Sequence, residues 1–349
     1  MSGGVDSTTA AAKLVKEGFQ VVGVTMKLWE AGEDEEYFES GCCSVKDAHD
    51  ARMAAAKLGF RHFTLDLRRT FQDSVIEDFI AEYRAGRTPN PCIRCNSFLK
   101  WEALWERKNS FGLEFLATGH YARIRETDDG IGLFKAIHLQ KDQSYALWGL
   151  PREKLAKTIF PLGDMEKSEV RCYASELGLR VADKAESQEI CFIPDNNYGK
   201  FLEKKGIKPV PGDIIDHEGR VIGTHSGIIY YTIGQRKGLG GGFDQPMYVN
   251  RIDSDSNKIY IGPREQVVFK DIEIHRVNWL VGEIPTDNFE AEVKIRYADK
   301  GSPAEIEPVG KDKLRIHFPA GVSAPTPGQS AVLYVGERLI AGGVILSAA

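Results

Sequence analysis

The chain opens with MSGGVDSTTAAAKLVKEG over residues 1–18 and continues with VVGVTMKLW over residues 21–29. The first stretch joins two adjacent glycines, flanking serines and an aspartate to an alanine-rich run, which we expect to be helical from Thr8 to Glu17. A glycine-rich turn that opens a helix offers backbone N–H groups and the positive end of the helix dipole to an anion. The second stretch is almost continuously apolar, as is typical of a strand buried on both faces.

The same alternation of helix and strand continues along the first half of the chain. Capping residues, apolar periodicity and closing glycines mark the boundaries of the elements. We expect helices at about residues 44–58 and 71–85, and buried strands at residues 62–67 (HFTLDL) and 115–124 (FLATGHYARI). Strands that alternate with helices predict an α/β fold with a doubly wound parallel sheet.

The pattern changes after about Tyr198. Helical periodicity fades, and short alternating runs are separated by glycine, proline and aspartate turns. Such runs predict two small all-β modules, of which the last is a β-barrel. A break near Gly262 and Pro263 separates the two, so we predict domains at residues 1–198, 199–264 and 265–349.

Composition limits the class of protein. The chain has 349 residues, of which 42% are hydrophobic, and a formal charge of −5. No apolar run reaches membrane-spanning length and no signal peptide precedes the loop, so we expect a cytoplasmic protein without a membrane partner. Residues 30–39 carry six acids and no base, and without them the rest of the chain would be slightly basic. Local basic patches for nucleic acid therefore remain compatible with the overall charge.

The SGGVDS loop lacks the lysine of a Walker A loop and the spacing of the dinucleotide-binding GxGxxG motif. It resembles the phosphate loop of the N-type ATP pyrophosphatases, which adenylate a substrate oxygen and release pyrophosphate. On this interpretation Ser2, Gly3, Gly4 and Ser7 wrap the β- and γ-phosphates, and Asp6 helps to hold Mg²⁺. The plain alternative is a capped helix start whose glycines serve a tight turn.

A second informative stretch is GRTPNPCIRCNSFLKW, residues 86–101. Its prolines predict a rigid, non-helical approach to a helix that begins near Asn96. The positive end of that helix favours a thiolate, so we expect at least one reactive cysteine between Cys92 and Cys95. Half of a zinc site is the weaker alternative, because a second CxxC or a histidine pair is missing.

Six cysteines in a chain of this kind indicate metal, redox or nucleophile chemistry rather than a disulfide framework. Taken alone, Cys191 in ESQEICFIPD is typical of a small buried hydrophobic residue, and Cys172 is best explained in that way. Cys42 and Cys43 receive no role.

The motifs SGGVDS, TPNPCIRCN, ATGHYA, KDQSY, SQEICFI, TIGQRKGLG and TPGQSAV stand in this order along the chain. They span residues 2–332, and the whole chain resembles the tRNA-specific 2-thiouridylases. The resemblance implies an N-type ATP pyrophosphatase domain, a central β module and a tRNA-contacting C-terminal barrel. It also implies that ATP activates the C2 oxygen of the wobble uridine in certain tRNAs, after which sulfur replaces that oxygen.

The resemblance also implies the site residues. ATP is expected against the loop from Ser2 to Ser7, including Val5, with its adenosine near Met26 and Gly119 at the carboxyl edge of the sheet. Cys191 is expected to receive a persulfide sulfur and Cys95 to be the nucleophile that completes the transfer, after which the two cysteines close a disulfide. The target base is expected at Asn90, Pro91 and Cys92, and other tRNA contacts at His120, Lys141, Asp142, Gln143, Arg296, Tyr297 and Gln329.

Some of these residues also have plainer explanations. Arg296 and Tyr297, beside Lys294, suit phosphate contact plus base stacking, yet they equally suit a solvated strand face. His120 alone would be a hydrogen-bonded histidine at a strand end. The expected partners are therefore tRNA and a sulfur donor protein or another source of sulfide.

Cys92 departs from the family, because many relatives carry an aspartate there that is thought to act as a general base. We hypothesise that Cys92, Cys95 and Cys191 hold a 4Fe-4S cluster whose fourth iron binds sulfide. The rival account keeps a persulfide on Cys191, resolved by Cys95, with Cys92 as a spectator.

Two other classes of function stay open at this point. One is an adenylating ligase or amidotransferase subunit that acts on a small molecule, and the other is a non-catalytic RNA-binding protein. We also expect a native start upstream of Met1 that adds a short apolar strand, because phosphate loops of this kind follow a central strand.

Overall fold

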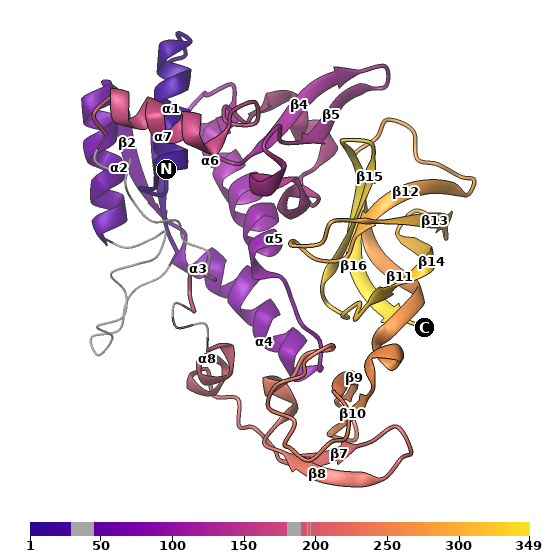
Figure 1. Cartoon of the computed structure of the whole chain (residues 1–349). Coiled ribbons are helices and arrows are strands. Elements are labelled where there is room, and N and C mark those ends of the chain that lie inside the picture. The colour runs from indigo at the N-terminus through magenta and orange to yellow at the C-terminus, as the bar shows by residue number, and fades with distance from the viewer. Residues whose placement is uncertain (29–44, 180–189, 194, 196) are drawn as a thin grey trace. The chain divides into compact units, whose positions relative to one another are not determined.

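The computed structural model describes residues 1–28, 45–179, 190–193, 195 and 197–349. The chain forms two compact units that do not follow the order of the sequence. Unit 1 comprises residues 1–75, 92–196 and 337–339, and unit 2 comprises residues 76–91, 197–336 and 340–349. Figure 1 shows helices and short strands in the first part of the chain and strands in the last part.

Unit 1 contains the α/β elements. Its helices are α1 (Val5–Lys16), α2 (Val45–Leu58), α3 (Arg68–Phe71), α5 (Pro91–Cys95), α6 (Leu104–Ser110) and α7 (Lys167–Glu176). Its strands are β1 (Val22–Lys27), β2 (Arg61–Asp66), β3 (Leu116–Ala117), β4 (Ala122–Thr127), β5 (Gly130–Lys135) and β6 (Thr158–Ile159). β1 pairs with β2 and β3 pairs with β6, both in parallel, which confirms the predicted α/β class.

Helices α1 and α7 pack against each other within unit 1. Val5 and Ala10 of α1 meet Val170 and Ala174 of α7 in one buried cluster, which also includes Tyr121. Val170 and Ala174 are four residues apart, which puts them on one face of α7. This packing brings the first turns of the two helices together, and the SGGVDS loop opens one of them.

Three local predictions for unit 1 were wrong. α1 begins at Val5 rather than Thr8, so part of the SGGVDS motif is helical. β2 is mostly exposed rather than buried, because β1 is its partner in a two-stranded sheet. Residues 115–124 form two strands rather than one, because the chain leaves β3 at Thr118 and then pairs antiparallel with β5 as β4.

The helix that carries two of the cysteines also starts earlier than predicted. α5 begins at Pro91, where the missing N–H of proline costs no intrahelical hydrogen bond. Cys92 and Cys95 are therefore helical rather than placed ahead of a helix at Asn96. A π-helical segment, Asn96–Ala103, follows Cys95 directly, and such segments are frequent at functional sites.

Unit 2 opens its central module with helices rather than with strands alone. α4 (Glu77–Arg84) lies against α8 (Tyr198–Lys204), where the rings of Tyr83 and Tyr198 stack with centroids 5.1 Å apart. A four-stranded sheet follows, with β7 (Gly212–Ile215), β8 (Val221–His225), β9 (Tyr248–Asp253) and β10 (Lys258–Gly262) in the order β8-β7-β10-β9. The predicted central β module is therefore present, with a helical start.

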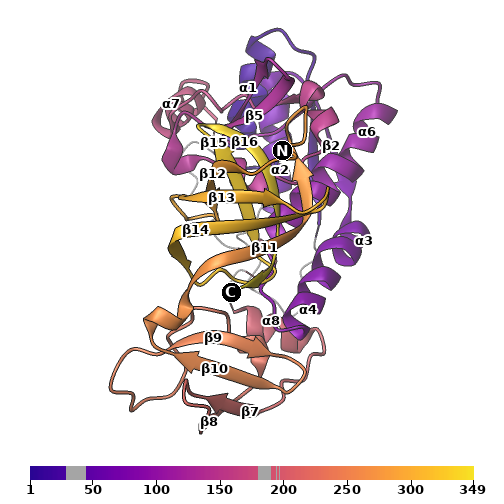
Figure 2. The ribbon, with the colours of Figure 1, turned by 90° about the vertical axis from the view of Figure 1, so that its right-hand side faces the viewer.

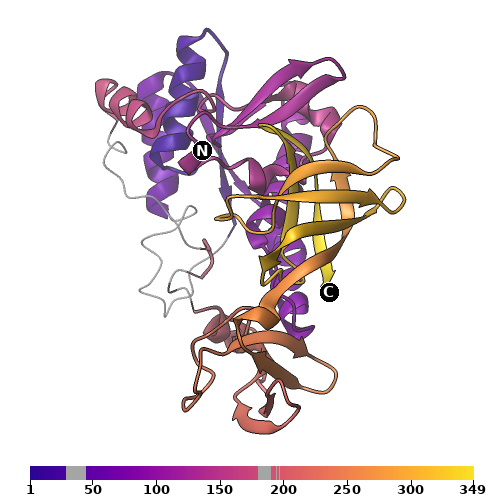
Figure 3. The same ribbon diagram turned by 45° about the vertical axis from the view of Figure 1, so that its right-hand side comes forward.

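The last part of unit 2 is a closed β-barrel (Figures 2 and 3). Its strands are β11 (Val268–Trp279), β12 (Phe289–Lys294), β13 (Ser302–Pro308), β14 (Lys313–Ser323), β15 (Ser330–Val335) and β16 (Arg338–Ala348). The order β11-β14-β13-β12-β15-β16 closes because β11 also pairs with β16, which confirms the predicted barrel. Alternate side chains fill its interior, among them Val293, Ile306 and Ile316.

No helix in the described part of the chain is both long enough and apolar enough to cross a membrane.

Candidate functional site

The two ends of the SGGVDS loop are tied together by hydroxyl groups. The Ser2 N–H donates to Ser7 Oγ at 3.0 Å, and the Ser2 and Ser7 hydroxyl oxygens lie 3.2 Å apart. Ser7 Oγ in turn donates to the carbonyl oxygen of Gly4 at 3.3 Å. These bonds curl the backbone of Gly3 and Gly4 over the N-terminus of α1, where backbone N–H groups lack intrahelical acceptors.

Two glycines make the loop possible. Gly3 has φ +67°, and a Cβ there would lie 2.2 Å from the carbonyl oxygen of Asp47 in α2. A Cβ on Gly119 would lie 2.8 Å from the carbonyl carbon of Asp6 and the nitrogen of Ser7. Because backbone atoms cannot give way as side-chain ends do, both positions require glycine. The predicted nucleotide residue Gly119 thus lies directly against the loop.

Asp6 is the charged centre of this loop. Lys167 Nζ lies 2.6 Å from Asp6 Oδ1, and the Tyr121 hydroxyl donates to the same oxygen at 2.8 Å. The Lys167 side chain is only 9% exposed, whereas that of Asp6 is 33% exposed. Within the described residues both hydrogen bonds to Asp6 end on Oδ1, which leaves Oδ2 available to a metal ion.

The predicted Lys141-Asp142-Gln143 turn is connected by hydrogen bonds to the SGGVDS loop. The backbone N–H of Tyr121 donates to Gln143 Oε1 at 3.1 Å, so the turn is linked through Tyr121 to Asp6. Asp142 is buried, and its carboxylate accepts hydrogen bonds from Ala136 N, Ser144 N and Ser144 Oγ. These contacts give Asp142 a place within the fold, and its predicted contact with tRNA stays a prediction, as does that of Lys141.

His120 is held between two polar partners. Its Nε2 lies 3.1 Å from Lys100 Nζ and its Nδ1 lies 2.7 Å from Thr118 Oγ1. Because a lysine ammonium only donates, Nε2 accepts and Nδ1 carries the proton. Burial, together with the charge of Lys100, holds the pKa of His120 well below its usual value. A neutral imidazole is therefore the resting form.

The other predicted adenosine residue, Met26, is half-buried in β1 and lies opposite Leu65 of β2. Met1 lies along the same strand, since its N-terminal nitrogen donates to the Val24 carbonyl and its own carbonyl accepts from Thr25 Oγ1 at 2.7 Å. Whether a strand precedes the loop stays a prediction.

Cys92 is exposed, whereas Cys95 and Cys191 are half-buried. In the part of the chain that the structure describes, no three His, Cys, Asp or Glu side chains come together to hold a metal ion. The role of Cys92, Cys95 and Cys191 as cluster ligands stays a prediction. Next to Cys191, the buried ring of Phe192 packs edge-to-face on Phe71 at 5.5 Å.

The remaining cysteines divide into two groups. Cys172 is exposed and donates to Glu176 Oε1 at 3.5 Å, so its assignment as a buried residue was wrong. α7 buries Val170 and Ala174 on the other face, which turns Cys172 outward. Glu176 raises the pKa of the Cys172 thiol through this hydrogen bond and through its charge. Cys42 and Cys43 lie outside the described residues.

In unit 2 the Thr-Pro-Asn-Pro loop, residues 88–91, is held by the barrel and by the central module. Gln329 Nε2 donates to the carbonyl oxygens of Thr88 at 2.9 Å and Pro89 at 3.2 Å. The Thr88 N–H donates to the Pro327 carbonyl at 2.9 Å, and the Thr88 hydroxyl donates to Thr232 Oγ1 at 3.2 Å. Gln329 therefore positions the residues that precede Asn90 and Pro91.

The other barrel residues predicted to contact tRNA are exposed. Arg296 Nη2 donates to the carbonyl oxygens of Ser323 and Ala324, at 2.8 Å and 2.6 Å. Tyr297 follows it, with 49% of its surface exposed. An anchored guanidinium beside an exposed ring suits a phosphate contact next to a stacked base, and the contact itself stays a prediction.

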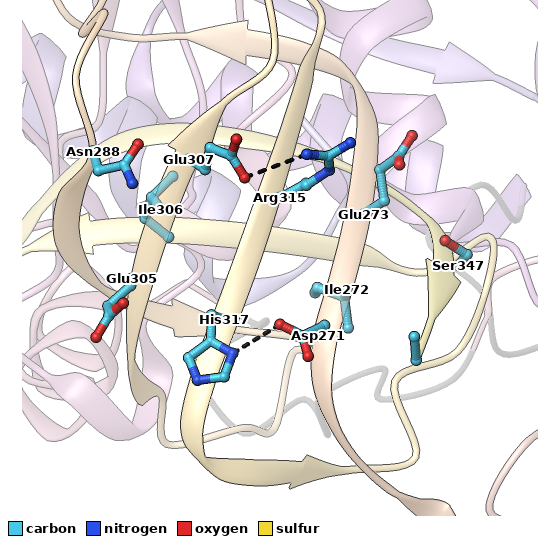
Figure 4. A pocket seen from close by; sticks show the side chains of 11 residues that line it. Asp271, Ile272, Glu273, Asn288, Glu305, Ile306, Glu307, Arg315, His317 and Ser347 are labelled. Atoms are coloured by element: carbon cyan, nitrogen blue, oxygen red, sulfur yellow. Dashed lines mark hydrogen bonds and ion pairs between the residues drawn. The ribbon is translucent and has the colours of Figure 1, made fainter.

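Another face of the barrel is acidic. Figure 4 shows a surface pocket over β11, β13 and β14 in which Asp271 pairs with His317 at 2.7 Å and Glu307 pairs with Arg315 at 3.5 Å. Glu273 and Glu305 add two further carboxylates to its lining. The excess of carboxylates repels a polyanion, so this face does not suit a phosphate backbone.

Sequence reasoning missed Lys167, Tyr121 and Thr88. Lys167 and Tyr121 lie far along the chain from their partner Asp6 and reach it through the packing of α7 and the turn after β3. The ATGHYA motif held a signal for Tyr121, since it contains that residue, but nothing in KSEVR distinguishes Lys167 from an ordinary first residue of a helix.

The closed loop on an α/β unit defines a PP-loop domain, whose architecture fits ATP. Family models match residues 1–195 (tRNA methyl transferase HUP domain), 199–263 (tRNA methyl transferase PRC-barrel domain) and 269–345 (aminomethyltransferase beta-barrel domain). The chain belongs to the tRNA-specific 2-thiouridylase family. It is 45% identical to tRNA-specific 2-thiouridylase MnmA of Carboxydothermus hydrogenoformans, over 99% of this chain and 96% of that protein.

A second relative is similar over nearly its whole length. The chain is 44% identical to the MnmA of Acetivibrio thermocellus, over 99% of this chain and 97% of that protein. Among solved structures it is similar to the U34-tRNA thiolase NcsA from Methanococcus maripaludis with its 4Fe-4S cluster, with 19% identity and a TM-score of 0.34. That match covers 59% of this chain and 64% of the other.

Proposed function

We propose that this protein is a tRNA-uridine 2-sulfurtransferase, which uses ATP to replace the C2 oxygen of the wobble uridine with sulfur. The observation that carries the proposal is the closed SGGVDS loop, with Asp6 bonded to Lys167 and Tyr121, in a chain that matches 2-thiouridylases along its whole length. A small-molecule ligase would have no use for the cysteines, and a non-catalytic RNA-binding protein would not need the loop.

The phosphate loop binds and orients ATP on this proposal. The β- and γ-phosphates suit the backbone of Gly3 and Gly4 and the hydroxyls of Ser2 and Ser7, because N–H groups at a helix N-terminus bind anions. The close packing at Gly3 leaves no room for a larger residue in this loop. Asp6 suits Mg²⁺, since a single carboxylate plus phosphate oxygens is a usual magnesium environment. The metal would neutralise the charge that develops on departing pyrophosphate.

Two cysteines carry out the sulfur transfer, which oxidises them to a disulfide. The uridine O2 attacks the α-phosphorus of ATP, and pyrophosphate leaves. The terminal sulfur of a persulfide on Cys191 then attacks C2, and AMP leaves with the former O2. Finally the thiolate of Cys95 attacks Sγ of Cys191, which forms a Cys95–Cys191 disulfide and releases 2-thiouridine. A thiol reductant then regenerates both cysteines, and a sulfur donor reloads Cys191.

We route the sulfur through a persulfide, because no three His, Cys, Asp or Glu side chains of the described residues come together to hold a metal ion. Cys92 is then an exposed neighbour of the target base rather than an iron ligand. Cys92 does not take over the general-base role of an aspartate. Near neutral pH an ordinary aspartate is ionised and can accept a proton, whereas an ordinary cysteine thiol is mostly protonated.

On this proposal tRNA contacts Asn90 and Pro91 in the loop that Gln329 holds, and Arg296 and Tyr297 in the barrel. The acidic pocket on β11, β13 and β14 stays away from the phosphate backbone. Gln329 would then serve recognition by shaping the base-facing loop in addition to any contact of its own.

The test is to follow ATP cleavage and tRNA thiolation together. The purified protein is incubated with ATP and Mg²⁺, with a persulfide-generating donor, and with or without unmodified tRNA. We expect AMP and pyrophosphate to form only with tRNA, and 2-thiouridine to form only with the sulfur donor as well. AMP formation on a small molecule without tRNA would favour the ligase, and RNA binding without AMP formation would favour the non-catalytic protein.

A further inference from the structure

The TIGQRKGLG motif begins with a turn, residues 232–237, in the central module, and the proposed sulfur transfer makes no use of it. One side chain closes this turn. Gln235 Oε1 accepts from Thr232 N at 3.1 Å, and Gln235 Nε2 donates to the Lys237 carbonyl at 2.9 Å. Leu239, which is 4% exposed, then packs into the core of the module. The turn is therefore fixed on both sides.

The turn presents two cations that the fold does not use. Arg236 and Lys237 are exposed, and in the part of the chain that the structure describes neither side chain has an ion pair or a hydrogen bond. Asp244 is the one acid among residues 232–246. Open space follows the cations, since among the described residues a Cβ built at any of positions 240–242 would meet nothing within 4 Å. Such cations can bind an anion without first breaking an internal bond.

The same turn is bonded to segments that are expected to contact tRNA. The Thr88 hydroxyl donates to Thr232 Oγ1 at 3.2 Å, which joins the turn to the Thr-Pro-Asn-Pro loop. A Cβ on Gly234 would lie 2.7 Å from the Cβ of Ala324, whose carbonyl accepts from Arg296 Nη2 at 2.6 Å. All of these residues belong to unit 2. The turn therefore adjoins both the loop expected to face the target base and the residues that anchor Arg296.

We propose that Arg236 and Lys237 bind backbone phosphates of the tRNA beside the target nucleotide, as a contact made by the central module. The inference rests on the proposed function, which supplies the RNA. A strand whose base reaches the Thr-Pro-Asn-Pro loop carries its neighbouring phosphates past the segment bonded to that loop. Because a phosphate contact positions a strand without reading its bases, the turn strengthens the binding of every tRNA substrate alike.

The test measures how the affinity of the full-length protein for unmodified tRNA, and for the anticodon stem-loop alone, depends on salt. The variant that combines Arg236→Gln with Lys237→Gln loses two phosphate contacts. Its slope of log affinity against log salt should be shallower by about 1.4–1.8. From about 50 to 200 mM salt the wild type should thus lose roughly tenfold more affinity than the variant. The stem-loop should show the same difference, because it contains the target nucleotide and its neighbours.

Two controls separate a phosphate contact from a general loss of charge. Arg236→Lys combined with Lys237→Arg keeps both cations and should retain the wild-type slope. Lys208→Gln is the matched control for Lys237→Gln alone, because Lys208 is also an exposed lysine of the central module. Lys237→Gln should reduce the slope by about 0.7–0.9, and Lys208→Gln should leave it unchanged. The thermal unfolding midpoint should stay the same in all these variants.

The proposal is wrong if the double glutamine variant keeps the wild-type slope, or if Lys208→Gln changes the slope as much as Lys237→Gln does. A change seen with tRNA but not with the stem-loop would place the contact elsewhere on the tRNA and refute it. Slower sulfur loading with unchanged RNA binding would assign the turn to the sulfur donor protein and also refute it.

Failure of this inference differs from failure of the proposed function. If the double glutamine variant binds RNA as the wild type does while the wild type makes 2-thiouridine, only the role of the turn is refuted. If the wild type makes no 2-thiouridine but shows the expected difference in salt dependence, the sulfurtransferase is refuted and the RNA contact stands.

Discussion

The Thr-Pro-Asn-Pro loop is fixed to the barrel where the backbone of Gly328 passes close to the backbone of Thr88. A Cβ on Gly328 would lie 2.9 Å from the carbonyl oxygen of Thr88 and 3.1 Å from both its carbonyl carbon and its nitrogen. Gly328→Ala should therefore push the loop away and break the hydrogen bond from Thr88 N to Pro327 O. Residues 88–91 should open, while the rest of the barrel keeps its closure.

The free-energy cost of Gly328→Ala has two contributions. Gly328 has φ +91°, and a left-handed backbone costs an alanine about 1–2 kcal/mol. Overpacking against the Thr88 backbone adds about 1–3 kcal/mol. Gly310 offers a matched control, because it has φ +78° but no atom within 4 Å of a built Cβ. Gly310→Ala should show the conformational cost without the clash.

Amide hydrogen exchange at Thr88 is the assay. Pro89 and Pro91 have no amide hydrogen, so a peptide spanning the loop reports chiefly on Thr88 and Asn90. Gly328→Ala should speed exchange at Thr88 by roughly five- to 150-fold, the factor that corresponds to the overpacking cost alone. Equal exchange in Gly328→Ala and Gly310→Ala would show that the close approach does not hold the loop.

Three further predictions concern the chemistry. Cys191→Ser should still form AMP and pyrophosphate with tRNA but make no 2-thiouridine, and equal loss of both products would show that its role is misassigned. Cys92→Ala should thiolate at close to the wild-type rate after anaerobic treatment with iron and sulfide; a variant that loses both iron binding and thiolation would restore the cluster hypothesis. The pKa of His120 is lowered by burial and then by Lys100, so below about pH 6.5 the unfolded chain binds a proton that the folded chain does not. Stability from this group is thus present above pH 6.5 and lost as the pH falls, and urea unfolding at pH 7.5 and 5.5 should show a smaller loss for His120→Gln than for the wild type; the same loss in both would contradict it.

Much of the fold follows from local patterns. The switch near Tyr198 from helical periodicity to short alternating runs predicts the change from α/β to β architecture, because burial on one face imposes a period of two on a strand. The motif order likewise predicts the family. Pro91 held the signal for the start of α5, since proline favours the first helical position. The same prolines also predict a non-helical approach, and that interpretation placed the expected start at Asn96.

The rest depends on contacts that local patterns do not encode. FLATGHYARI is apolar enough to read as one strand, yet Gly119 must pass within van der Waals distance of the loop at Asp6, which ends β3. Cys172 looked buried because its helix is amphipathic, but the packing of α7 on α1 decided which face turned inward. The ion pair of Lys167 with Asp6 follows from the same packing and not from any spacing in the sequence.

The division of the chain into two units has a consequence for its ancestry. Residues 76–91 belong with unit 2, while the residues on either side of them belong with unit 1, and residues 337–339 return to unit 1. During synthesis α4 emerges before α8. The rings of Phe79 and Tyr83 therefore cannot pack against Phe201 and Tyr198 until residues 92–196 have been made. A gene fragment that ends near residue 198 would leave that apolar face uncovered. Recombination between relatives therefore cannot exchange either unit as one continuous cassette, and the two units are expected to have diverged together.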